Sequence, residues 1–76
     1  MNNTLLNKAE KWLNEFGITT IAHPNCLLVN RDDVDNVLSE RDGDYGWFLN
    51  EVKIGIESNR IHWTHRDDNW LYMDTL

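Results

Sequence analysis

The segment from Val52 to Met73 constrains the fold most strongly, because its first half alternates apolar and polar residues. Alternation with a period of two is typical of a strand that is buried on one face. Ser58 and Asn59 fall at a two-residue turn, since asparagine tolerates the positive φ angles that such turns require. The pattern therefore predicts a hairpin in which Val52–Glu57 pairs with Arg60–His65.

A second hairpin is expected directly after the first. The polar run Arg66–Asn69 predicts a four-residue loop, and a further strand follows over Trp70–Met73. In this register Trp63 lies opposite Tyr72. The two hairpins together predict a three-stranded meander at the C-terminus.

Two amphipathic helices are predicted before this meander. Apolar residues recur at helical spacing over Thr4–Phe16, with polar residues on the other side. Gly17 supplies the left-handed residue that ends this helix. Asn30 is a good N-cap for a second helix, which is expected to end near Arg41. The aromatic segment Tyr45–Leu49 can be a loop, a short strand or a helical turn.

The segment Ile18–Val29 leaves two arrangements open. It contains two apolar runs around Pro24, which favours a turn. Either both runs form a small hairpin, or only the second run joins the main sheet. The 76 residues (1–76) predict a single domain of the α+β class. We expect two amphipathic helices packed on one face of an antiparallel sheet containing a C-terminal three-stranded meander.

Composition limits the environment of the protein. The only cysteine is Cys26, so an internal disulfide is excluded. No apolar run approaches the roughly 20 residues of a membrane-spanning helix. The first four residues, Met-Asn-Asn-Thr, match neither a signal peptide nor a transit peptide. We therefore expect a cytoplasmic protein.

The net charge of −6 is concentrated in one window of the sequence. Seven carboxylates and a single base, Arg41, lie between Asp32 and Glu51, whereas acids and bases balance in the remainder of the chain. The chain has no Lys/Arg patch that could neutralise phosphates. Direct binding to nucleic acid or to anionic membranes is therefore disfavoured.

This acidic window is the candidate binding site. One interpretation is a surface that serves only solubility. The other is a binding face, on which aromatic anchors accompany negative charge and a basic partner is steered into place. The candidate partner-binding residues are Asp32, Asp33, Asp35, Glu40, Asp42, Asp44, Tyr45, Trp47 and Glu51.

Basic partners of this kind include host proteins that themselves bind nucleic acid, such as nucleases and CRISPR effectors. In size and charge, the chain is similar to the inhibitors that phages and mobile elements make against host nucleases, among them anti-CRISPR and anti-restriction proteins that imitate DNA. The first hypothesis is therefore a non-enzymatic inhibitor. The alternative is an immunity protein, antitoxin or adaptor that binds through an aromatic sheet face, and a metal-binding module is the third.

The sequence contains no recognisable catalytic or cofactor motif. Ser–His–Asp order, a Gly-rich phosphate loop and a CxxC pair are all absent, so we expect neither an enzyme nor a cofactor. Four acids match positions 1, 3, 5 and 12 of a calcium loop: Glu40, Asp42, Asp44 and Glu51. Tyr45 stands where that loop needs glycine, which disfavours calcium.

His62 and His65, followed by Asp67 and Asp68, form a second cluster of potential metal ligands. Residues three apart in a regular strand point to opposite faces, so the two histidines should diverge unless a bulge intervenes. We therefore expect one exposed and one partly buried histidine beside a polar turn, and no metal site.

Overall fold

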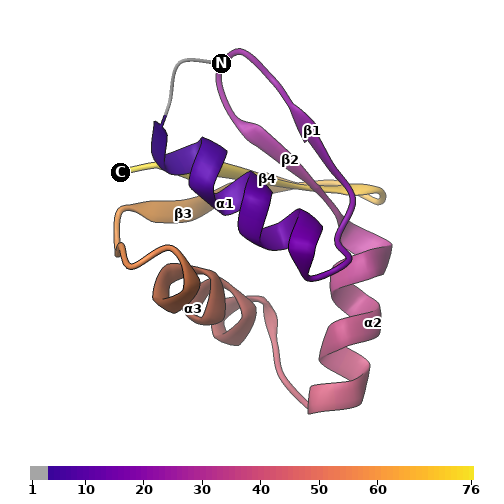
Figure 1. Cartoon of the computed structure of the whole chain (residues 1–76). Coiled ribbons are helices and arrows are strands. Elements are labelled where there is room, and N and C mark those ends of the chain that lie inside the picture. The colour runs from indigo at the N-terminus through magenta and orange to yellow at the C-terminus, as the bar shows by residue number, and fades with distance from the viewer. Residues whose placement is uncertain (1–3) are drawn as a thin grey trace.

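The computed structural model describes residues 4–76, which form three helices and a four-stranded antiparallel sheet (Figure 1). The helices are α1 (Thr4–Glu15), α2 (Arg31–Arg41) and α3 (Tyr45–Gly55). The strands are β1 (Thr20–Ala22), β2 (Leu27–Asn30), β3 (Ile61–Arg66) and β4 (Trp70–Thr75). Their order is β1-β2-β4-β3, so β4, the last strand in the sequence, lies in the interior of the sheet.

The predicted α+β class is confirmed, but the three-stranded meander is wrong. Val52–Gly55 belongs to helix α3, and only β3 and β4 form a hairpin at the C-terminal end. The buried residues of α3 are Phe48, Leu49 and Val52, which recur at helical spacing. Ile54, whose place in the alternation suggested a strand, is 72% exposed.

The register between β3 and β4 also differs from the prediction. Trp63 pairs with Met73, and Tyr72 pairs with His65 instead. The predicted loop Arg66–Asn69 is wrong, because Arg66 belongs to β3 and pairs with Leu71, which moves the pairing beside the turn by two residues. A bulge at Thr64 adds one unpaired residue to β3 and reduces this offset to one residue at Trp63.

The two predicted helices are confirmed, together with the residues that end and begin them. α1 ends in a Schellman motif, in which Gly17 has a φ of 92° and the Ile18 amide donates to the Leu13 carbonyl at 2.9 Å. Asn30 is the N-cap of α2, and its side chain accepts a hydrogen bond from the Asp33 amide at 2.9 Å.

The two apolar runs of the segment Ile18–Val29 form a hairpin, which is the first of the two arrangements left open. Ile21 of β1 pairs with Leu28 of β2, and Leu28 pairs in turn with Tyr72 of β4. Both hairpins are therefore joined into one sheet through the β2–β4 pairing.

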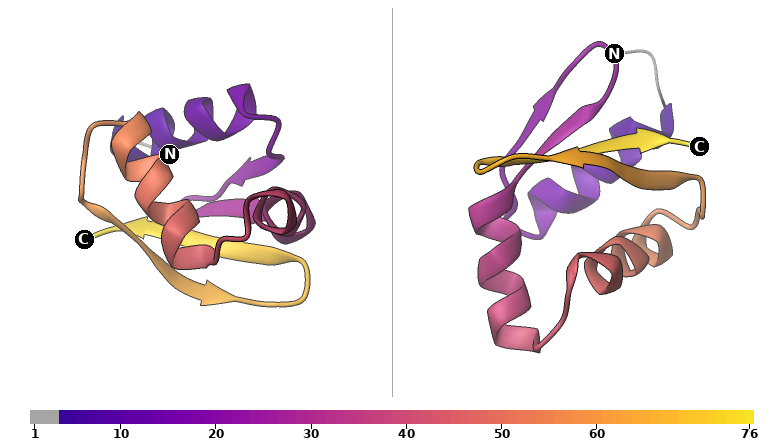
Figure 2. Two further views of the ribbon diagram at one scale, coloured as in Figure 1. Left: turned by 90° about the horizontal axis from the view of Figure 1, so that it is seen from below. Right: turned by 180° about the vertical axis from the view of Figure 1, so that it is seen from behind.

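The core lies between the sheet and the helices. Figure 2 shows that the helices lie on one side of the sheet, so the opposite face of the sheet is not covered by a helix. The large, fully buried side chains of the core are Leu6, Leu13, Leu27, Val29, Val34, Phe48, Val52, Ile61, Leu71 and Met73. They come from all three helices and from every strand except β1. None of the helices within residues 4–76 is long and apolar enough to cross a bilayer.

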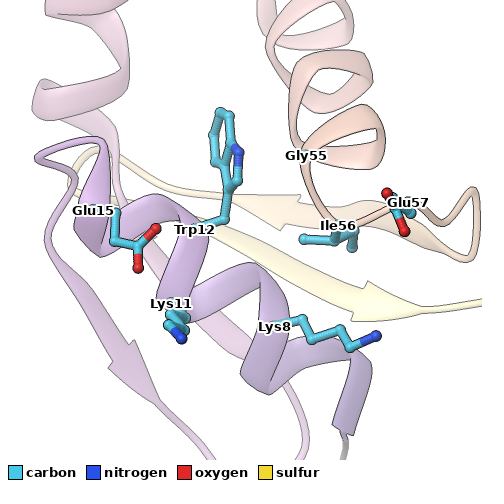
Figure 3. Close-up of a pocket in the computed structure, with 7 residues that line it drawn as sticks. All are labelled: Lys8, Lys11, Trp12, Glu15, Gly55, Ile56 and Glu57. Atoms are coloured by element: carbon cyan, nitrogen blue, oxygen red, sulfur yellow. The ribbon is translucent and has the colours of Figure 1, made fainter.

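Trp12 fixes the contact between α1 and α3. Its indole stacks on Phe16 with ring centroids 5.2 Å apart and meets Phe48 edge-on at 6.4 Å. Figure 3 shows this indole extending from α1 toward Gly55 at the end of α3. A Cβ atom at Gly55 would overlap with Nε1 of Trp12, so the close approach of the two helices requires glycine there.

We expect Gly55→Ala to lower the free energy of unfolding by roughly 1–3 kcal/mol, because Trp12 must leave its stack or α3 must move. Gly46→Ala in the same helix is the matched control. A Cβ there would meet Asp44 Oδ1 at 3.4 Å, at the limit of ordinary contact, and alanine favours helix. Urea denaturation followed by circular dichroism measures both variants. Equal stability of the two would contradict the packing role of Gly55.

Candidate interaction surface

The acidic window folds into α2, α3 and the turn between them. Figure 1 shows α2 running away from the sheet and α3 returning toward it, so the turn lies at a corner of the molecule. The exposed carboxylates follow one another along α2 and this turn, and we call them the acidic surface: Asp32, Asp35, Glu40, Asp42 and Asp44. Asp33 and Glu51, the other two acids of the window, are half-buried.

Two of the predicted site residues have local roles in the fold. The Asp33 carboxylate accepts a hydrogen bond from the Thr19 amide at 2.8 Å, which ties the segment before β1 to α2. The Asp44 carboxylate accepts one from the Trp47 amide at 2.8 Å and is the N-cap of α3. Asp33 therefore joins two segments of the chain, and Asp44 sets where α3 begins.

Tyr45 lies at the centre of a hydrogen-bonded network, instead of projecting freely as an anchor. Its hydroxyl donates to Asp35 Oδ1 at 2.6 Å and accepts from Arg31 Nε at 3.0 Å. Its carbonyl accepts from Trp63 Nε1 at 3.0 Å, and the Arg66 guanidinium lies 5.5 Å from its ring centroid. We call these contacts the Tyr45 network; they join α2, α3 and β3.

Two groups of the Tyr45 network, the Tyr45 hydroxyl and the Arg31 guanidinium, have raised pKa values. Partial burial raises the pKa of Tyr45, and the hydrogen bond to Asp35 raises it further, so the hydroxyl stays protonated. The hydrogen bond to Tyr45 raises the pKa of Arg31, which stays charged. The Arg31–Asp35 contact at 3.7 Å is the one salt bridge within residues 4–76. The other carboxylates of the acidic surface thus have no Lys or Arg partner in that part of the chain.

A groove lies between the three helices, next to the acidic surface. It has a volume of about 110 Å³ and is lined by Trp12, Phe16, Val37, Arg41, Trp47, Phe48 and Glu51. We call it the helix groove. Trp47, one of the predicted site residues, is half-buried there, whereas Phe48 belongs to the core. Phe16 is 45% exposed, so part of an aromatic ring faces solvent beside the carboxylates.

Sequence reasoning missed three residues of this region. Trp12 and Phe16 belong to the apolar stripe of α1, but the stripe is wider than the surface that covers it. The signal that could have placed Phe16 is its position at the helix end, just before Gly17. No local pattern indicates Arg31, because its partner Tyr45 is 14 residues away.

A further depression of about 250 Å³ lies between α1 and the end of α3, and Figure 3 shows the residues that line it. They are Lys8, Lys11, Trp12, Glu15, Gly55, Ile56 and Glu57. Two lysines are balanced by two glutamates, so the depression has no excess charge that would favour one class of ligand.

The uncovered face of the sheet carries apolar side chains. Ile21, Leu28 and Tyr72 are paired across three neighbouring strands and therefore share a face. They alternate along the strands with the buried Val29 and Leu71, so they point away from the core. Ile21 is 46% exposed. This is the surface that the alternative hypothesis of an aromatic sheet face requires.

The calcium-loop pattern does not lie on a loop. Helix α3 separates Asp44 from Glu51 by seven residues, a rise of about 10 Å. The Asp44 carboxylate is also engaged in capping α3. Within the described residues, no group of three or more His, Cys, Asp or Glu side chains is placed to hold a metal ion.

His62 and His65 do not diverge, because the bulge that was the stated exception to this prediction is present in β3. His62 pairs with Asp74 and His65 pairs with Tyr72, and these alternate residues of β4 point the same way. The bulge at Thr64 shifts the alternation of β3 and brings both histidines to the uncovered face.

Asp67 organises the β3–β4 turn beside the Tyr45 network. Its carboxylate accepts hydrogen bonds from the amides of Asn69 and Trp70 at 2.8 and 2.7 Å and from the Tyr72 hydroxyl at 2.9 Å. The Asn69 amide, followed by the other two donors, lowers the pKa of Asp67. The Asp67 carbonyl accepts from Arg31 Nη1 at 2.8 Å, so the turn also positions Arg31.

Comparison of the chain with protein-family models, curated proteins and solved structures found no match. We therefore infer the candidate function from the geometry of the described residues. That geometry offers negative charge, carboxylate acceptors and an adjoining apolar groove, which are properties of a binding surface.

The lowered pKa of Asp67 has a consequence for acid stability. A folded-state pKa below the ordinary 3.8 adds stability that is complete above about pH 5 and is lost as the pH falls through the folded-state pKa. Asp67→Asn preserves the shape of the side chain and removes the charge. We expect it to be less stable than the wild type at pH 7, with the two converging below about pH 4.

Urea denaturation at pH 7, 5, 4 and 3 measures this difference. Asp68→Asn removes the same charge from the exposed neighbouring residue and is the control. Its stability should follow the wild type across the series. An offset between the wild type and Asp67→Asn that stays constant from pH 7 to pH 3 would show that the carboxylate charge has no such role.

Proposed function

We propose that this chain is a small non-enzymatic binding protein that occupies the basic, nucleic-acid-binding surface of a host protein. A nuclease or a CRISPR effector is the proposed class of partner, and the chain would act as an inhibitor of the anti-restriction or anti-CRISPR type by imitating DNA. The observation that supports this proposal is the acidic surface. Four of its five carboxylates have no Lys or Arg within 4.0 Å among residues 4–76.

Unpaired carboxylates are available to a partner without first breaking an internal salt bridge. Exposed like charges on one element also raise the local potential, which accelerates the encounter with a basic surface and makes binding sensitive to salt. The Tyr45 network fixes the relative position of α2 and α3, so less conformational entropy is lost when the partner binds.

A second candidate function uses the uncovered sheet face. The exposure of Ile21 beside Leu28 and Tyr72 supports an immunity protein, antitoxin or adaptor that binds through apolar contacts there. Binding of this kind would tolerate loss of the acidic surface and would fail on Ile21→Ser or Trp70→Ala. The first candidate predicts the opposite pattern.

The test of the proposal is displacement of labelled duplex DNA from purified restriction nucleases and CRISPR effectors. The test variant neutralises three exposed acids of the acidic surface: Asp32→Asn, Glu40→Gln and Asp42→Asn. The control variant neutralises three exposed acids elsewhere: Glu15→Gln, Glu57→Gln and Asp68→Asn. Each set contains one residue with a φ of 56°, Asp42 or Glu57, so the backbone demands are matched.

We expect the wild type to displace DNA from at least one of these proteins, with an affinity that falls as salt rises. The test variant should lose about tenfold in affinity or more, and the control should remain within about twofold, because steering depends on where charges lie. Equal losses of affinity in the two variants would show that only the net charge of the chain matters, and would contradict a binding role of the acidic surface. Failure of the wild type to displace DNA from any of them would refute the proposal.

A further inference from the structure

We infer that the helix groove receives one apolar side chain from the partner, and that basic residues flank this side chain in the partner's sequence. The inference rests on the function proposed above and adds the chemistry of the segment that binds. The ligand is a basic peptide segment with a single aromatic or aliphatic anchor, presented on the surface of the partner.

The size of the groove argues for a side chain as its occupant. Small-molecule sites have volumes of about 300–1,000 Å³, and the helix groove has about 110 Å³. A cavity of about 150 Å³ lined by apolar side chains takes a benzene ring. A groove somewhat smaller than this, open on one side, matches a single leucine or phenylalanine side chain.

The lining of the groove supports an apolar anchor. Trp12 stacks in parallel on Phe16, and this pair is fixed by the edge contact with Phe48 in the core. Trp47 closes the other side of the groove. Tryptophan is enriched at the centres of protein interfaces, where it packs around an inserted side chain without losing much entropy. The walls are therefore rigid before the partner arrives.

The charge around the groove argues for basic flanks. Glu51 lines the groove itself. Trp47 and Arg41 also line the neighbouring depression that contains Asp42 and Asp44, so the apolar walls and the carboxylates are continuous. Arg41 is the one base along this stretch, and three nearby acids outnumber it. A segment seated in the groove would thus extend cationic residues over carboxylates.

Charge density explains why an anchor is needed. Helix α2 has 11 residues and is about 16 Å long, and duplex DNA of that length carries roughly nine charges. Of the five carboxylates of the acidic surface, three lie on α2 itself: Asp32, Asp35 and Glu40. The acidic surface therefore has a lower charge density than DNA. This density is sufficient to steer a basic partner, but it gives a lower affinity than DNA itself would have. Burial of an apolar side chain in the groove supplies the missing contribution.

Three synthetic nine-residue peptides test the inference. The first has Lys and Arg around a central phenylalanine, the second replaces phenylalanine with serine, and the third keeps phenylalanine but replaces the basic residues with glutamine. The readout is the set of indole N–H signals in ¹⁵N-labelled protein, which come from Trp12, Trp47, Trp63 and Trp70. The last two are outside the groove and serve as internal controls.

We expect the first peptide to shift the signals of Trp12 and Trp47 and to leave those of Trp63 and Trp70 in place. It should bind roughly tenfold more tightly than the serine peptide, because buried aromatic anchors are among the residues that contribute most to the binding free energy. The matched variants are Phe16→Ser and Ile21→Ser, whose side chains are 45% and 46% exposed. The first should abolish the advantage of phenylalanine, and the second should preserve it.

The outcomes separate this inference from the proposed function. Equal binding of the phenylalanine and serine peptides would overturn the anchor and leave the acidic surface as the binding site. Equal binding of the basic and neutral phenylalanine peptides would overturn the basic flanks and with them the inference, whereas the proposed function is still decided by displacement of DNA. If Trp12 and Trp47 do not respond to any peptide, the inference is refuted, and displacement of DNA decides the proposed function by itself.

Discussion

The hydrogen bonds of Tyr45 are the interaction on which the geometry of this molecule most depends. Its hydroxyl is shared between Asp35 and Arg31 on α2, and its carbonyl accepts from Trp63 on β3. Because Tyr45 is the first residue of α3, these contacts set the angle at which α3 returns from the corner to the sheet. Arg31 extends the network to the β3–β4 turn through the Asp67 carbonyl.

This arrangement separates structural carboxylates from available ones. Asp33, Asp35 and Asp44 accept hydrogen bonds that position helices, whereas Asp32 and Glu40 extend into solvent on α2. The walls of the helix groove come from three helices. The Tyr45 network fixes α2 against α3, and the packing of Trp12 on Phe48 fixes α1 against α3. A rigid corner with unpaired negative charge and an adjoining apolar groove is suited to recognition of a basic surface that carries an apolar projection.

The features that could be predicted from the sequence are those that depend only on residues close together in the chain. The caps at Asn30 and Gly17 and the charge window are of this kind. Helix α3 was missed because Val52, Ile54 and Ile56 alternate like a strand, although Phe48, Leu49 and Val52 have helical spacing after the N-cap Asp44. The bulge at Thr64, the exposure of Phe16 and the Tyr45 network could not be predicted, because each depends on partners distant in the sequence.

A double-mutant cycle measures whether Tyr45 holds α2 through Asp35. Unfolding free energies are measured for the wild type, Tyr45→Phe, Asp35→Asn and the double variant. We expect the two substitutions to be coupled by about 1 kcal/mol, because either one breaks the same charge-assisted hydrogen bond. Additive effects, with a coupling energy indistinguishable from zero, would contradict it.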